Sequence, residues 1–89
     1  MESTSQLKNL DVYPNPTRDI FNIRFVSEKI QDLSVRVLSI IGEIVYKEKA
    51  SQFIGEYTKK IDLTDNSKGV YFLEITTDNG VVNRKIVIQ

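Results

Sequence analysis

The chain has 89 residues, of which 40% are hydrophobic and 27% are charged, and this composition is typical of one folded domain. Twelve basic residues balance 12 acidic ones, so the chain lacks the basic surplus with which general nucleic-acid-binding proteins neutralise phosphates. Histidine and cysteine are both absent, which excludes a thiolate or imidazole metal site, a cysteine nucleophile, a triad with histidine and a disulfide.

The first ten residues are polar and show no hydrophobic periodicity. We predict that residues 1–10 are a linker or the artificial start of an excised domain, and that the globular domain covers residues 11–89. The polar start has no apolar segment of the signal-peptide type, so if the natural protein leaves the cytoplasm, its signal is expected upstream of this chain. No stretch approaches the roughly 18 apolar residues that a membrane-spanning helix needs.

From Asp11 onward the sequence favours β-strands, because apolar and polar residues alternate and β-branched residues are frequent. The polar stretches 27–31 and 48–55 are predicted to be connections. The pattern predicts an all-β domain, a seven-strand antiparallel β-sandwich of immunoglobulin-like shape. The seven predicted strands are 10–13, 20–25, 33–37, 43–47, 57–63, 70–77 and 81–88.

Two turns carry the strongest local signals in the first half of the chain. Pro14 and Pro16 flank Asn15, remove two amide donors and fix two φ angles, so we predict a rigid turn in which either X–Pro bond can be cis. Gly42 follows Ile40 and Ile41 and is predicted to have positive φ in a three-residue hairpin loop.

The last 21 residues predict a hairpin around Asn79-Gly80, since this pair is typical of a type I′ turn. This register places Glu74 opposite Lys85 as a cross-strand ion pair. It also gives the two strands one solvent-exposed face and one core face. The predicted core residues are Tyr71, Leu73, Ile75, Ile86 and Ile88.

Phe72 and Val87 face each other in the same register, on the face that also carries Glu74 and Lys85. Two interpretations remain open: a neighbouring element covers these two side chains, or they form an exposed apolar spot. Exposed apolar patches often mark partner surfaces.

Three segments now stand in order: Val12–Thr17 with its Tyr-Pro-Asn-Pro motif, the hairpin 35–45 around Gly42, and the closing segments 69–75 and 84–87. Together they resemble the C-terminal sorting domain, type A, of cargo proteins of the type IX (Por) secretion system of Bacteroidetes. The resemblance covers residues 11–89. The residues that carry the family motif are Tyr13, Pro14, Asn15, Pro16, Gly42, Gly69 and Tyr71.

The resemblance implies a non-catalytic export signal at the end of an exported protein. It implies recognition by the outer-membrane translocon, removal by a sortase-like peptidase at the cell surface, and attachment of the upstream cargo domain. The protein would then pass through the periplasm to the outer-membrane surface or the medium. We expect Phe72, Lys85 and Val87 to take part in recognition, and we expect no cofactor, metal or nucleic acid.

Other functions receive less support from the residues. Asp62, Asp65 and Asn66 could bind calcium, but their spacing matches no EF-hand loop and favours hydrogen-bonded turns. A chain this short has little room for a catalytic cleft. The alternative function is a carbohydrate- or protein-binding accessory module of a secreted protein, with a sugar platform formed by the tyrosines 13, 46, 57 and 71. The oligomeric state stays open, since exposed edge strands can pair between copies.

Overall fold

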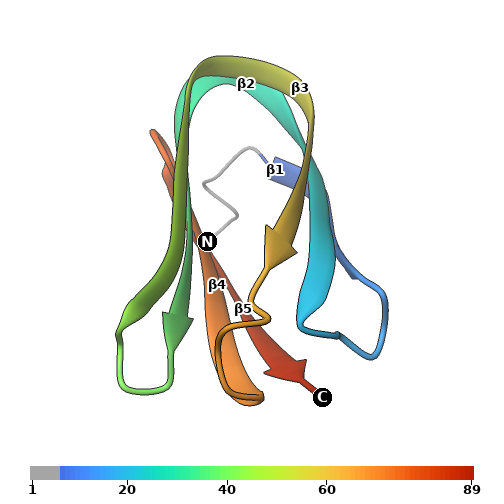
Figure 1. The fold of residues 1–89 in the computed structure, drawn as a ribbon. Helices are drawn as coiled ribbons and strands as arrows, with labels where there is room; N and C mark the ends of the chain where they lie inside the picture. Colours follow the sequence, from blue (N-terminus) through green and yellow to red (C-terminus); the bar gives the residue numbers. More distant parts are fainter. Residues whose placement is uncertain (1–6) are drawn as a thin grey trace.

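The computed structural model describes residues 7–89, which form one antiparallel sheet of five strands (Figure 1). The strands lie in the order β1-β2-β4-β5, and β3 pairs with β2 outside this path. Within the described residues no helix is long and apolar enough to cross a membrane. The strands are β1 (Leu7–Tyr13), β2 (Ile20–Ser39), β3 (Ile44–Asp62), β4 (Gly69–Thr77) and β5 (Gly80–Ile88).

Two long strands give the sheet its curled, half-barrel form. β2 has 20 residues and β3 has 19, and the two bend together as a double arch (Figure 1). The first half of β2 pairs with β1 and with the end of β3, whereas its second half pairs with the start of β3 and with β4. Each long strand therefore crosses from one side of the core to the other.

The bend in β2 lies where the pairing with β3 shifts register, between Ser27 and Gln31. Gln31 is buried and its Nε2 donates a hydrogen bond to Ser27 Oγ at 2.9 Å, while Ser27 Oγ donates to the Lys29 carbonyl at 2.8 Å. In β3 the bend includes Gln52 and Gly55, which both have positive φ. Local polar bonds thus accompany the bend of β2, whereas in the bend of β3 Phe53 packs against the core.

The predicted seven-strand, immunoglobulin-like sandwich is wrong, although all seven predicted segments fall largely within strands. The stretches 27–31 and 48–55 are not connections: they continue the ladder between β2 and β3, as Gln31 opposite Phe53 and Leu33 opposite Ala50 show. Most of their side chains are polar, although Ala50 and Phe53 pack against the core. Four predicted strands therefore merge into two, and the all-β class and the antiparallel pairing are confirmed.

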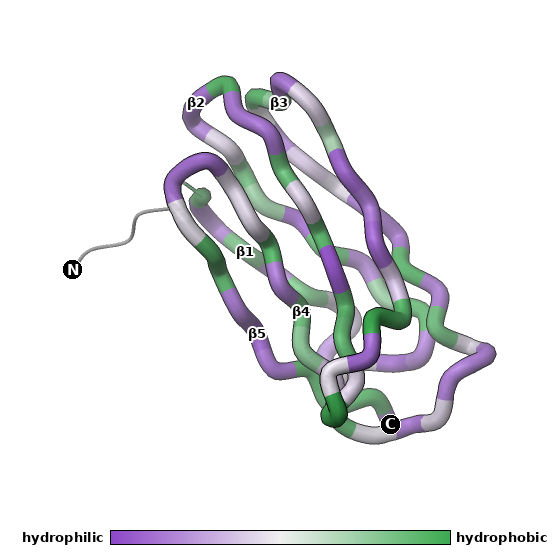
Figure 2. The backbone as a smooth tube through the Cα atoms, turned by 90° about the vertical axis from the view of Figure 1, so that its left-hand side faces the viewer, coloured by the Kyte–Doolittle hydropathy of each residue, from purple (hydrophilic) through white to green (hydrophobic). Residues whose placement is uncertain are grey.

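The core lies between the two sides of the curled sheet, and its residues come from alternate positions of the strands. Along β2, Phe21, Ile23 and Phe25 are fully buried, as their alternation with polar neighbours predicts. Figure 2 shows the same alternation of hydrophobic and hydrophilic residues along the strands. The other buried apolar residues are Leu33, Val35, Val37, Tyr57, Ile61, Leu63, Tyr71, Leu73, Ile75, Ile86 and Ile88.

The terminal hairpin differs from its predicted register by two residues. Thr77 pairs with Gly80, so Asp78 and Asn79 form the turn, and the positive φ lies at Gly80. This register brings Asn79 to the bend of β2, where its Nδ2 donates a hydrogen bond to Gln31 Oε1 at 3.2 Å. Asn79 N–H also donates to Thr77 Oγ1 at 3.0 Å.

A shift of two residues keeps every side chain on its predicted face, so the predicted core face is confirmed. The predicted pairs across the hairpin are wrong, because Glu74 faces Asn83 and Lys85 faces Phe72. Glu74 forms its ion pair with Arg36 of β2 instead, with Arg36 Nε at 2.7 Å from Glu74 Oε1.

β1 begins earlier than predicted, since residues 7–10 lie in the strand rather than in a linker. The pairing of β1 with β2 shifts between Lys8 and Asp11, and Asn9 has a φ of 60°. This bulge interrupts the alternation of side chains, which explains why sequence periodicity misses the start of the strand. The remaining part of the predicted linker, residues 1–6, lies outside the described residues.

Candidate functional site

The Tyr-Pro-Asn-Pro turn and the C-terminus lie side by side. Thr17, just after the turn, forms a parallel bridge with Ile88, and Gln89 N–H donates a hydrogen bond to the Thr17 carbonyl at 3.2 Å. The Tyr13–Pro14 and Asn15–Pro16 bonds are both cis. Two motif segments that are about 70 residues apart in the sequence therefore form one local structure.

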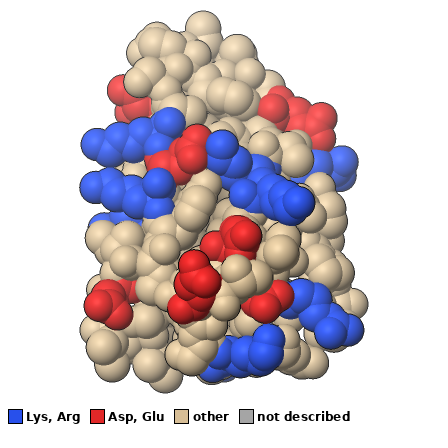
Figure 3. All heavy atoms as spheres, viewed as in Figure 1, with Lys and Arg blue, Asp and Glu red and all other residues tan. Residues whose placement is uncertain are grey.

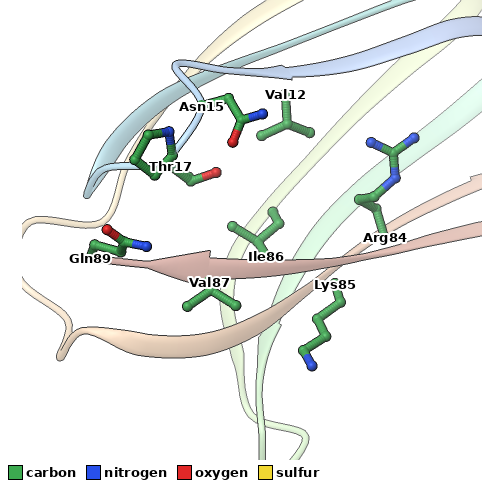
Figure 4. Close-up of a pocket in the computed structure, with 9 residues that line it drawn as sticks. Val12, Asn15, Thr17, Arg84, Lys85, Ile86, Val87 and Gln89 are labelled. Carbon is green, nitrogen blue, oxygen red and sulfur yellow. The ribbon is translucent and has the colours of Figure 1, made fainter.

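A groove of about 310 Å³ lies between this turn and β5 (Figure 4). Ile86 and Val12 contribute apolar side chains, whereas Arg84 and Lys85 lie at one end and extend to opposite sides of β5. The lining side chains include two cations and no carboxylate. Such a lining is suited to binding an anionic or extended partner. The residues that line the groove are Val12, Asn15, Pro16, Thr17, Arg84, Lys85, Ile86, Val87 and Gln89.

The three predicted recognition residues lie on the outward face of β4 and β5. Phe72 is 37% exposed and Val87 is 45% exposed, so the interpretation as an exposed apolar spot is confirmed and the covered alternative is wrong. Phe72 is opposite Lys85, while Val87 is opposite Val70. Lys85 and Val87 also line the groove. Phe72 is next to these residues because it pairs with Lys85 across the hairpin.

The exposed spot is larger than predicted, because the fold adds a row of apolar side chains from other strands. Ile44 of β3 pairs with Leu38 of β2, and Leu38 pairs with Phe72. Ile40 and Ile41, in the loop between β2 and β3, are 70% and 84% exposed. Sequence analysis missed this row since its members come from three strands with unrelated spacing.

The remaining motif residues have structural positions. Gly42 has a φ of 88° in the loop between β2 and β3, as predicted, and its N–H donates a hydrogen bond to the Ser39 carbonyl at 2.9 Å. Gly69 begins β4 with a φ of 138°. Tyr71 is buried in the core, and its hydroxyl donates to the Ser67 carbonyl at 2.5 Å, which fixes the loop before β4.

On the opposite side of the half-barrel, charged side chains join the two halves of β3. Lys59 Nζ lies 2.9 Å from Glu48 Oε2, and the Tyr46 hydroxyl donates to Glu48 Oε1 at 3.1 Å. The hydrogen bond from Lys59 lowers the pKa of the Glu48 carboxyl, whereas burial and the neighbouring carboxylate raise the pKa of Tyr46. Burial also raises the pKa of Tyr57 to about 12.

The acidic cluster before β4 forms a hydrogen-bonded turn. Asp62 Oδ1 accepts hydrogen bonds from Thr64 N–H at 2.9 Å and Thr64 Oγ1 at 2.7 Å, and these bonds lower the pKa of Asp62. Among residues 7–89, no group of three or more acidic side chains is arranged to hold a metal ion. The Asx-type turn predicted for Asp62 is thereby confirmed.

The four tyrosines do not share one surface. Tyr57 and Tyr71 are buried in the core, Tyr46 is half-buried beside Glu48, and Tyr13 is 36% exposed at the end of β1. The face shown in Figure 3 carries interspersed positive and negative side chains. The described surface therefore offers no stacked aromatic platform for a sugar.

Comparisons with known proteins agree with the position of these motifs. Residues 11–89 match the family described as "Secretion system C-terminal sorting domain" of the Por system. The chain is 32% identical over 88 residues to ulvan lyase NLR42 of Nonlabens ulvanivorans, and 33% identical over 83 residues to beta-agarase D of Zobellia galactanivorans. These alignments cover 97% and 92% of this chain but only 15% of each relative.

Proposed function

The chain belongs to the family of secretion system C-terminal sorting domains, and from this premise we propose that it is a type A export signal read by the type IX translocon at the outer membrane. The domain itself performs no catalysis in this proposal. Its partners are the translocon, a sortase-like peptidase at the cell surface and the cargo domain to which it is attached.

The observation that supports this proposal best is the extent of the family match. It covers residues 11–89, which include nearly all of the described sheet, the proline turn and the C-terminal strand. The bridge between Thr17 and Ile88 holds these two motif segments together. A receptor that contacts the groove can therefore read both segments only when the domain is folded.

The surface that we assign to recognition consists of Phe72, Lys85 and Val87. All three side chains are exposed on one face, and Lys85 forms no ion pair with any residue that the structure describes. An unpaired cation beside apolar side chains is available to a partner without first breaking an internal bond.

The cargo in this proposal is a secreted enzyme that degrades polysaccharides, because the two similar proteins are an ulvan lyase and a beta-agarase. The chain spans about 15% of their length, so the catalytic domain of such a cargo would be a separate part of the protein. After export through the periplasm, the peptidase would remove the sorting domain and attach the cargo to the cell surface.

Cleavage supplies the test of this proposal. We expect the cut on the N-terminal side of Leu7, since a peptidase needs an extended backbone and the backbone of β1 is held in the ladder with β2. Mass spectrometry of the full-length protein from its native culture should find the domain in the periplasmic form and not in the surface form. If the mature surface protein retains residues 7–89, the domain is a persistent module and the proposed fate is wrong.

A further inference from the structure

The outer edge of β5 differs from the other strand edges of the sheet. β5 pairs with β4 over nine consecutive residues without a register shift. β1 has a bulge between Lys8 and Asp11, and the pairing of β3 shifts at three places. Bulges, prolines and charged side chains usually protect edge strands from pairing with other chains. β5 has no bulge and no proline, and its only charged side chains are those of Arg84 and Lys85.

The direction of the free backbone groups follows from the bond at the end of the strand. Gln89 N–H points away from β4 toward Thr17. Because alternate residues of a strand direct both backbone groups to the same edge, those of Val81, Asn83 and Lys85 also point away from β4. Among residues 7–89 no backbone group pairs with these three, since the contact with Thr17 occupies the edge only at the end of the strand, through Gln89 N–H.

The side chains along this edge set the chemistry of an added strand. Arg84 lies on the groove side with Ile86 and Val12, and Lys85 extends to the opposite side (Figure 4). Neither cation forms an ion pair with another described residue. An added strand would thus meet one positive charge on each of its faces, with apolar side chains next to both.

A second copy of the chain does not fit this pattern. If β5 pairs over its whole length with β5 of a second copy in a two-fold antiparallel register, the two-fold axis passes through Arg84, and Arg84 faces Arg84 of the copy. If the axis moves by one residue to Lys85, Lys85 faces Lys85 of the copy. Like charges that face each other directly across strands are destabilising. A centre at Asn83 still leaves the two copies of Arg84 as diagonal neighbours.

We propose that the outer edge of β5 binds an extended segment of a partner protein as an added strand, and that this segment carries two adjacent acidic residues flanked by apolar residues. The backbone groups of Val81, Asn83 and Lys85 would supply the hydrogen bonds. The acidic pair would face Arg84 and Lys85, and the apolar residues would contact Val87 and, in the groove, the half-buried Val12.

The test is amide hydrogen exchange, measured by NMR on the 89-residue chain with a capped peptide, Thr-Val-Ile-Glu-Glu-Thr-Val-Thr, as the probe. In the free chain the amides of Asn83 and Lys85 should exchange fast, while that of Arg84, which points toward β4, should be protected. At peptide concentrations up to about 1 mM, exchange at Asn83 and Lys85 should slow by about tenfold or more. A peptide with lysines in place of the glutamates should leave both rates unchanged.

Two variants separate the backbone from the side chains. Asn83→Pro removes an outward donor on an edge strand, where proline is tolerated, and should abolish protection by the peptide, whereas Asn83→Ala should bind like the wild type. The charge reversal Arg84→Glu with Lys85→Glu should switch the preference to the lysine peptide, so the proposal is tested even if the proline variant does not fold.

Three results would overturn the inference. Absence of protection with the acidic peptide rejects strand addition, and equal protection with both peptides rejects recognition by charge. A dimer of the free chain in sedimentation, with Asn83 and Lys85 already protected, would show that a second copy occupies the edge. Because binding is measured on the purified chain, none of these results depends on the proposed export function.

Discussion

Deletion of Lys85–Gln89 is expected to unfold the domain. The truncation removes Ile86 and Ile88, each 3% exposed, from the core, and it removes the bond between Gln89 and Thr17. It also leaves the first residues of β4 without partners on the β5 side. Loss of one large buried aliphatic side chain costs about 2–5 kcal/mol, and two such losses approach the total stability of about 5–15 kcal/mol that is typical of a domain.

Circular dichroism should show loss of the cooperative thermal transition in the truncated chain. Deletion of Gln89 alone is the matched control, because it removes one backbone hydrogen bond and leaves both isoleucines in place. A truncated chain that melts cooperatively near the wild-type temperature would contradict the assigned role of the terminal strand in the core.

The double variant Lys85→Ala with Val87→Ser should stay folded and yet be exported poorly. Lys85 has no ion pair to lose among the described residues, and Val87 is already 45% exposed. We expect the free energy of unfolding to fall by less than about 1 kcal/mol, which corresponds to a decrease in Tm below about 8 °C. The secreted fraction should fall severalfold, because both residues belong to the proposed recognition surface.

A second double variant, Lys60→Ala with Ile54→Ser, serves as the control. It also removes one exposed lysine and one half-exposed aliphatic side chain, Ile54 being 55% exposed, but on β3. Its secreted fraction should match the wild type. If the folded Lys85 and Val87 variant is secreted normally, the machinery reads another surface and the assignment of these two residues is wrong.

Local patterns predicted which side chains are buried but not how the strands are joined. Alternation placed Phe21, Leu73 and Ile86 in the core, since the side-chain period of a strand depends only on the backbone. Gly42 was predicted correctly for the same reason, because its positive φ is a local requirement of the hairpin loop. The arch of β2 and β3 was predicted to be two loops because most of its residues are polar. Its backbone nevertheless continues the pairing between β2 and β3.

The terminal hairpin makes a nonlocal contact in its observed register. The contact between Asn79 and Gln31 joins residues 48 positions apart, and no rule about turn residues contains it. That contact accompanies the shift that separates Lys85 from Glu74. The groove likewise depends on a nonlocal contact, the bridge between Thr17 and Ile88. Sequence analysis identified the proline turn and the last strand as separate motifs and missed the groove between them.

The secreted fraction of a reporter tests the central claim most directly. Residues 1–89 would be fused behind a signal peptide and a reporter protein, and expressed in a Bacteroidetes host with a type IX system and in an isogenic strain without it. We expect the reporter at the cell surface or in the medium of the first host, and in the periplasm of the second. A reporter that stays in the periplasm of the competent host, although the attached domain is folded, would contradict the assignment of this chain as an export signal.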